Sequence, residues 1–351
     1  METVSENKTP AYNNNITHTP GLTSSEIGNL WNTYVINSLV TCFKKSYLAN
    51  VDDKNARSLL KEALAIETQR LRKITDIFQK ENLPVPMGFS DSEDVNFKAP
   101  RLFSDNFYLY YLLCYSKFDI PINSINFVTS TRSDVLKFYA YCSNSFYQLF
   151  EHINNTILSK GLYIRPPYVT TSHNIDLVKK QSFLTGFLGE KRPLLAQEVS
   201  SVFHVILHNN TGKCLLTGFR QVVRSKKVRD YIDRGIKLAS KVSDTFSAIL
   251  QKEDIPVPIS WDTMVTESTV PPFSDRLIMS QTALLNTCGV LDFTNIMVYS
   301  YRHDIKANLL RLMPASGDFA EDGINILIEN GWLEEPPRTV DRRKLVNELQ
   351  H

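Results

Sequence analysis

Three acidic residues in the second half of the chain have the chemistry of metal ligands: Glu198, Glu321 and Asp322. Glu198 precedes an apolar stretch that begins at Val199, so its side chain can project into a helical bundle. Glu321 and Asp322 are expected near the end of a later helix, and in an antiparallel bundle that end could meet the helix of Glu198. Carboxylates that face one another from the helices of a four-helix bundle can bind iron or manganese. The competing interpretation is that they pair with Lys, Arg or backbone amides.

Two histidines on the same stretch could also bind a metal. His204 and His208 are four residues apart, so they lie on one face of a helix, a spacing that can chelate zinc. The stretch lacks the glutamate of an HExxH motif and an obvious third ligand, which favours partly exposed or hydrogen-bonded histidines. In the first half, Glu67 can point inward, but no Glu-x-x-His motif follows it. We therefore expect the first half to be free of metal.

Other catalytic patterns are absent from the sequence. Gly186-Phe187-Leu188-Gly189 lacks the strand-to-helix context of a nucleotide-binding loop. No Gly-x-Ser-x-Gly motif and no Cys/His arrangement beyond chance occurs. The sequence therefore favours a protein that is not an enzyme and predicts no cofactor. If the carboxylates do bind a divalent metal, Fe, Mn or Zn is the candidate.

Composition narrows the classes of partner and compartment. The 39 basic and 37 acidic residues nearly balance, which argues against nucleic-acid binding. The longest apolar stretch, residues 107–115, is too short to span a membrane. Residues 1–21 are rich in Asn and Thr and lack the pattern of a signal peptide. The five cysteines are scattered among apolar neighbours, which is typical of reduced thiols and favours a cytoplasmic protein.

An internal repeat determines the predicted architecture. Its copies share four motifs in the same order: residues 81–86 match 253–258, 100–105 match 271–275, 130–134 match 300–304, and 161–167 match 331–337. We predict a disordered tail at 1–21, a first unit at 22–168, a linker at 169–193, a second unit at 194–338 and a C-terminal tail at 339–351.

Each unit has the hydrophobic period of helices. Thr23 and Glu26 form the pattern of a capping box for a first helix that ends near Asn50. Pro84 ends a second helix, Ser133 is expected to cap a fourth, and Gly161 is expected to close it. About twenty residues, 83–103, connect the second and third helices.

The length of this connection predicts the topology. Twenty extended residues reach roughly 65 Å, whereas a helix of about 25 residues is roughly 38 Å long. The chain can therefore cross the whole bundle before the third helix starts. We predict an all-α protein of two tandem ferritin-like four-helix bundles, each with a long crossover between its second and third helices.

Several motifs resemble those of a known family. They are residues 83–86, 99–105, 161–167, 180–184, 258–262 and 320–323. The chain is similar to a bacillar domain-of-unknown-function family whose members contain two ferritin-like units. This resemblance covers residues 22–345 and implies a link to sporulation or the spore coat. Family members place histidines at the positions of Ser201, Val242 and Gln281, so this chain lacks the nitrogen ligands that such a pattern would supply.

Three functions remain open at this point. The favoured hypothesis is a non-enzymatic helical protein, associated with spores or stress, that acts through a protein partner or self-association. The alternative is a ferritin-like metal-binding oxidoreductase with a carboxylate site in the second unit. A carrier of a small apolar ligand is the third.

Overall fold

The structure is a computed structural model that describes residues 20–170, 174–187, 191–259, 262–342 and 344. The predicted tails at 1–21 and 339–351 lie mostly outside these residues. The first unit contains α1 (Ser24–Asn50), α2 (Lys54–Lys80), the short α3 (Asp91–Asp94), α4 (Asp105–Val128) and α5 (Ser133–Ser159). The second contains α6 (Ala196–Val222), α7 (Lys226–Gln251), α8 (Asp275–Tyr299) and α9 (His303–Glu329). Two 3-10 turns, η1 (Gln181–Leu184) and η2 (Asp262–Met264), lie in the connections.

The helix ends follow most of the local sequence signals. The Thr23 hydroxyl accepts a hydrogen bond from the Glu26 amide at 3.2 Å, and the Glu26 carboxylate accepts one from the Thr23 amide at 2.8 Å. The capping box is therefore confirmed. Gly161 follows α5 with a φ of 66°, as expected for a left-handed residue after a helix. The prediction for Ser133 was wrong. Ser133 is the first residue of α5 and Arg132 is its N-cap, because a carboxylate from another helix, Glu26, accepts the Arg132 amide at 2.7 Å.

Contacts between helix ends establish the direction of each helix. Glu26 joins the start of α1 to the start of α5, and Asp105 joins the start of α4 to that of α2 by accepting the Asp53 amide at 2.8 Å. In the second unit Glu198 joins α6 to α9, and Asp275 accepts the Ser225 amide at 2.8 Å at the start of α7. In the first unit α1 is therefore parallel to α5, and α2 is parallel to α4. In the second unit α6 is parallel to α9, and α7 is parallel to α8. This is the predicted single-crossover connectivity. A relationship to ferritin-like proteins beyond this connectivity stays a prediction.

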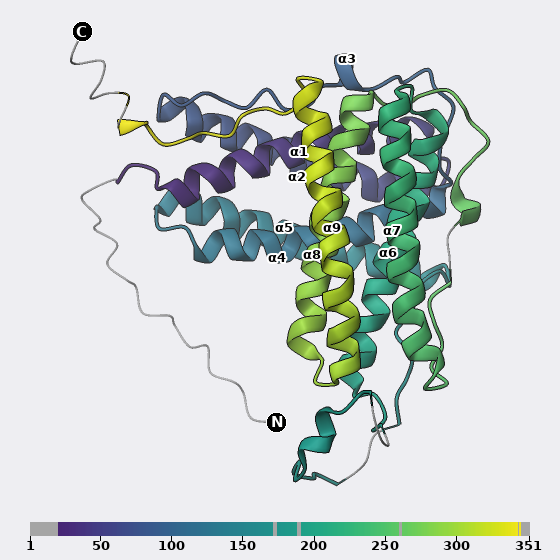
Figure 1. Cartoon of the computed structure of the whole chain (residues 1–351). Helices are drawn as coiled ribbons and strands as arrows, with labels where there is room; N and C mark the ends of the chain where they lie inside the picture. The colour runs from purple at the N-terminus through teal and green to yellow at the C-terminus, as the bar shows by residue number, and fades with distance from the viewer. Residues whose placement is uncertain (1–19, 171–173, 188–190, 260–261, 343, 345–351) are drawn as a thin grey trace, which may run out of the picture.

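The two bundles cross each other and share one core. Figure 1 shows the helices of the second unit running vertically and those of the first running roughly horizontally behind them. Rings from both units meet between them: Phe43 lies 4.3 Å from Phe273 and 5.6 Å from Phe219, centroid to centroid. The crossovers also pair, through single antiparallel bridges between Val95 and Phe273 and between Phe103 and Val265. The repeats therefore fold as two bundles, each of which buries part of the apolar surface of the other.

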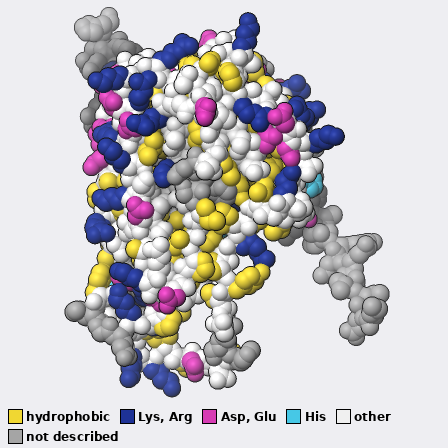
Figure 2. All heavy atoms as spheres, turned by 90° about the vertical axis from the view of Figure 1, so that its right-hand side faces the viewer, with side chains coloured by type: hydrophobic (Ala, Val, Ile, Leu, Met, Phe, Trp, Pro, Cys, Tyr) yellow, Lys and Arg dark blue, Asp and Glu magenta, His cyan; other side chains and the backbone are white. Residues whose placement is uncertain are grey.

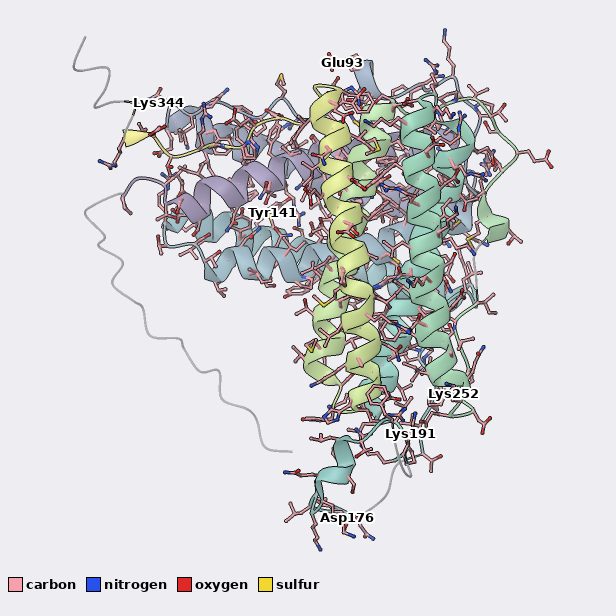
Figure 3. All side chains as sticks on the ribbon, viewed as in Figure 1. Glu93, Tyr141, Asp176, Lys191, Lys252 and Lys344 are labelled. Atoms are coloured by element: carbon pink, nitrogen blue, oxygen red, sulfur yellow. The ribbon has the colours of Figure 1, made fainter. Side chains whose placement is uncertain are left out.

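The crossovers run the length of their bundles. In Figure 3, Lys252, just after α7, lies at one end of the second unit, near Lys191 of the linker. Glu93 lies at the opposite end, where Asp94 accepts a hydrogen bond from the Ser274 hydroxyl at 2.6 Å, next to the start of α8. Within the described ranges, no helix is long and apolar enough to cross a membrane.

The stability of the first unit should depend on the ionisation of Glu26. Burial would raise the pKa of this carboxyl, but hydrogen bonds from the amides of Thr23, Arg132 and Thr131 outweigh it and lower the pKa from 4.5 to about 2. A carboxyl whose pKa is lower in the folded than in the unfolded protein stabilises the fold at pH values above its unfolded-state pKa. This stability is lost as the pH falls through its folded-state pKa. The full effect is roughly 3 kcal/mol.

We therefore expect Glu26→Gln to unfold more easily than the wild type at neutral pH, with the difference shrinking as the pH falls from about 4.5 to 2. Urea unfolding at a series of pH values measures this difference. A difference that stays constant down to the acid limit would contradict the assignment.

Candidate functional site

Glu198 is a structural carboxylate at the end of the second unit. Its side chain is fully buried and accepts two hydrogen bonds from the Arg192 guanidinium, at 2.7 and 2.8 Å. It also accepts the amides of Leu195 at 2.9 Å, Tyr301 at 2.9 Å and Arg302 at 3.1 Å. These donors occupy both oxygens and lower the pKa of the carboxyl against the effect of burial. Glu198 thus repeats the role of Glu26, and this saturated donor set does not fit a resident metal.

The structure does not bring Glu321 and Asp322 to Glu198. Glu198 contacts the start of α9, whereas Glu321 and Asp322 lie in the last third of that helix. Glu321 is exposed, and Asp322 forms an ion pair with Arg234 at 2.8 Å. The two ends were expected to meet in an antiparallel pair, but α6 and α9 are parallel. No group of three or more His, Cys, Asp or Glu side chains that could hold a metal is found in the part of the chain that the structure describes.

His204 and His208 do lie on one face of α6, with ring centroids 6.1 Å apart. The His204 Nδ1 lies 2.8 Å from the Ser200 carbonyl oxygen, within the same helix. Burial, Lys117 and His208 lower the pKa of His204 to about 4. The His208 Nδ1 lies 3.0 Å from both carboxylate oxygens of Asp292, on α8. His208 and Asp292 therefore form a buried dyad that joins two helices.

The centre of the first unit is filled by a cluster of four buried charges. Lys44 pairs with Glu67, and both side chains are fully shielded from solvent. Arg70 donates two hydrogen bonds to Asp119, at 2.9 and 3.0 Å, and a third to the Cys142 carbonyl at 2.8 Å. We name these four side chains the charge cluster. The inward orientation expected for Glu67 is confirmed, and its partner is a cation of the protein itself.

The second unit has no charges at the corresponding positions. The register between the units is 172 residues for the first two helices and 170 for the third. The charge cluster therefore corresponds to Leu216, Ala239, Val242 and Gly289. All four line a cavity of about 120 Å³, which we name the unit 2 cavity. Each of these uncharged residues is shorter than its counterpart in the first unit, and together they leave a space where the first unit packs two ion pairs.

The first unit supplies one wall of the unit 2 cavity. Phe107, Tyr111, Tyr115 and Phe118, all on α4, line it together with residues of α6, α7, α8 and α9. The Tyr111 hydroxyl donates to the Gln281 side-chain oxygen at 3.3 Å, across the interface between the units. Burial raises the pKa of Tyr111, so its hydroxyl keeps its proton and acts as a donor.

The His208–Asp292 dyad lies between the cavity and the surface. Both residues line the unit 2 cavity, and together with Phe118 they also line an adjoining groove of about 590 Å³. His204, Lys117 and Tyr299 line this groove as well. The dyad therefore lies where a small molecule could pass from the groove into the cavity.

Sequence reasoning identified His208 as a candidate but missed Asp292. A signal was present in the pattern of α8: Gln281, Leu285, Cys288 and Asp292 follow one another at helical spacing, so they share a face. Polar residues on the core face of a helix commonly need a partner. The partner itself lies on another helix, so the sequence pattern alone could not name it.

The family comparison covers both units. Residues 11–175 and 182–345 match the family described as "Protein of unknown function (DUF3231)". The chain belongs to this family. DUF3231 thus matches this chain twice, in agreement with the repeat. A search of curated proteins finds no match.

One solved structure is similar to part of this DUF3231 chain. It is described as a "putative spore coat protein" from Bacillus halodurans and shares 16% sequence identity, with a TM-score of 0.39. The match covers 43% of this chain and 98% of that one.

Proposed function

We propose that this DUF3231 protein is a non-enzymatic helical protein whose second unit binds a small, largely apolar molecule. The proposal rests on one observation: the positions that hold the charge cluster in the first unit line a cavity in the second unit. An empty cavity forfeits the contacts that its lining atoms would make, so unfilled space of this size destabilises a core. A ligand in the cavity would restore those contacts.

The size and lining support an apolar ligand. A cavity of roughly 150 Å³ lined by apolar side chains stays dry and binds benzene or xenon. The unit 2 cavity has about 120 Å³ and is lined mainly by apolar and aromatic residues. Its walls come from both units, so an occupied cavity would also strengthen the interface between them.

Benzene should therefore bind to the purified protein and stabilise it. At ten times its dissociation constant, benzene should raise the free energy of unfolding by about 1.4 kcal/mol. Gly289→Leu should abolish this effect, because a Cβ at Gly289 meets no atom within 4 Å and a longer side chain would fill the cavity. Titration calorimetry and thermal unfolding measure both expectations.

A matched control is Gly317→Leu. Gly317 is also helical and also has no atom within 4 Å of an added Cβ, but it is exposed and lies outside the cavity lining. This variant should bind benzene like the wild type. The proposal fails if benzene neither binds nor stabilises the wild-type protein, or if Gly289→Leu binds it equally well.

The wider role proposed for the protein rests on the family resemblance. We place it in the cytoplasm or in the spore or its coat, where it acts through a protein partner or self-association. The charges of its surface are mixed: Figure 2 shows Lys and Arg side chains interspersed with Asp and Glu over one face, with hydrophobic side chains between them. A mixed surface of this kind suits a protein partner better than nucleic acid.

The metal-binding oxidoreductase remains the alternative. It would need ligands other than Glu198, because that carboxylate is saturated by Arg192 and three backbone amides. Stoichiometric iron, manganese or zinc in protein purified without a histidine tag would favour this alternative.

A further inference from the structure

The contacts between the crossovers of the two units occur in reciprocal pairs. The Asn96 amide of the first unit donates a hydrogen bond to the Pro272 carbonyl of the second at 2.9 Å. A shift of 170 residues carries Asn96 to Thr266 and carries Leu102 to Pro272, and the Thr266 amide donates to the Leu102 carbonyl, also at 2.9 Å. A contact that recurs with its two partners exchanged is the mark of an interface with two-fold symmetry.

The remaining backbone contacts between the crossovers follow the same symmetry. The Ser274 amide donates to the Asp94 carbonyl at 3.0 Å, and the corresponding Ser104 amide donates to the Met264 carbonyl at 2.9 Å. The two antiparallel bridges described above also correspond to each other under the shift of 170 residues. Each unit therefore presents a self-complementary face, in which the same positions give and receive each contact.

Tyr111 and Gln281 lie on the axis that relates the two units. They are 170 residues apart and so occupy the same position in the two units, and the Tyr111 hydroxyl donates to the Gln281 side-chain oxygen at 3.3 Å. Both side chains are buried. A pair of first units would place two tyrosine rings at this point, whereas a pair of second units would place two shorter glutamines there. The axis therefore favours the pairing of unlike units, because both alternatives change the volume of a packed core.

The linker allows the units of one chain to separate. In Figure 3, Asp176 of the linker lies beyond the end of the second unit, and residues 174–182 are all exposed. An exposed loop can change its course without loss of buried contacts. It can therefore join two units that pair with different chains.

We propose that the self-complementary face is a dimerisation surface whose partner is a second copy of this chain. Two chains exchange units, so that the first unit of each pairs with the second unit of the other and every reciprocal contact is kept. This inference rests on the self-association proposed above and adds its surface and its partner. In such a dimer α4 of one chain forms a wall of the unit 2 cavity of the other, so each cavity needs both chains.

Refolding at high concentration tests this exchange. A protease recognition sequence inserted after Asp176, in the exposed part of the linker, allows the linker to be cut in the folded protein. Unlabelled and nitrogen-15-labelled chains are mixed in equal amounts and unfolded in urea. They are then refolded at about 1 mM, the order of the effective concentration that a short flexible linker provides. Dimers are isolated by gel filtration, cut, and weighed by native mass spectrometry.

We expect the cut to convert the dimers into particles of monomer size, about half of which combine a first unit of one label with a second unit of the other. The monomer fraction of the same mixture, cut in the same way, is the control and should give particles of a single label. The proposal is overturned if no dimer forms on refolding. Particles with two first units would contradict the selectivity assigned to Tyr111 and Gln281.

Dimers that keep their size after the cut would also overturn the exchange, but they would leave self-association in place through a different surface. Benzene takes no part in this experiment, so the ligand-binding function is tested separately. The failure of the exchange and the failure of the proposed function are therefore distinguishable.

Discussion

Replacement of Asp119 by Ala should lower the free energy of unfolding by about 3–5 kcal/mol, the usual cost of removing one partner of a buried ion pair. Asp119 is only 7% exposed, and it accepts two hydrogen bonds from Arg70 and others from Asn123 and Tyr115. Without it, the fully buried Arg70 guanidinium loses its counter-charge in a medium that solvates ions poorly. Urea unfolding followed by circular dichroism measures the loss.

Two controls separate the unpaired charge from other effects. The double variant Arg70→Met/Asp119→Leu removes both charges and should recover much of the loss, because apolar residues of similar volume often replace a buried ion pair without penalty. Asp322→Ala breaks the half-exposed pair with Arg234 and should change stability by no more than about 1 kcal/mol. A double variant less stable than Asp119→Ala would show that the ion pair itself contributes most of the stability.

Replacement of Phe273 by Ala should cost about 3–5 kcal/mol and should weaken both units together. Phe273 is 4% exposed and belongs to the crossover of the second unit, but its ring packs against Phe43 and Tyr47 of the first. Its loss leaves a hole in the core that both bundles share. Hydrogen exchange of backbone amides measures each unit separately, with the amides of α2 reporting on the first unit and those of α7 on the second.

Phe138→Ala is the matched control for this expectation. Phe138 is equally buried, but its cluster, with Trp31 and Tyr139, is confined to the first unit. The loss of protection should therefore fall mainly on the amides of α2. If Phe273→Ala lowers the protection of the α7 amides only, the shared core does not couple the units.

The sequence by itself determined the local features of this protein. The Thr23–Glu26 capping box, the turn at Gly161 and the long crossover follow from residues close together in the chain, and the repeat follows from a comparison of the two halves of the sequence. Helix caps and periodicity depend on neighbours within a few positions, so a single sequence contains all the information that they need. One helix end does not follow from local sequence. Ser133 is not the N-cap of α5, because Glu26, more than a hundred residues away in the chain, accepts the amide hydrogen bond at that helix end.

Only the tertiary structure decided how the chemically capable residues are used. Glu198 was expected near Glu321, but the parallel course of α6 and α9 gives it Arg192 and the start of α9 instead. His208 was identified from its spacing, whereas its partner Asp292 comes from α8, 84 residues later in the chain. Such pairings depend on which helix faces meet. The repeat shows that the two units share one plan, but a helix of the first unit forms a wall of the second unit's cavity, and this contact exists only after the bundles have packed.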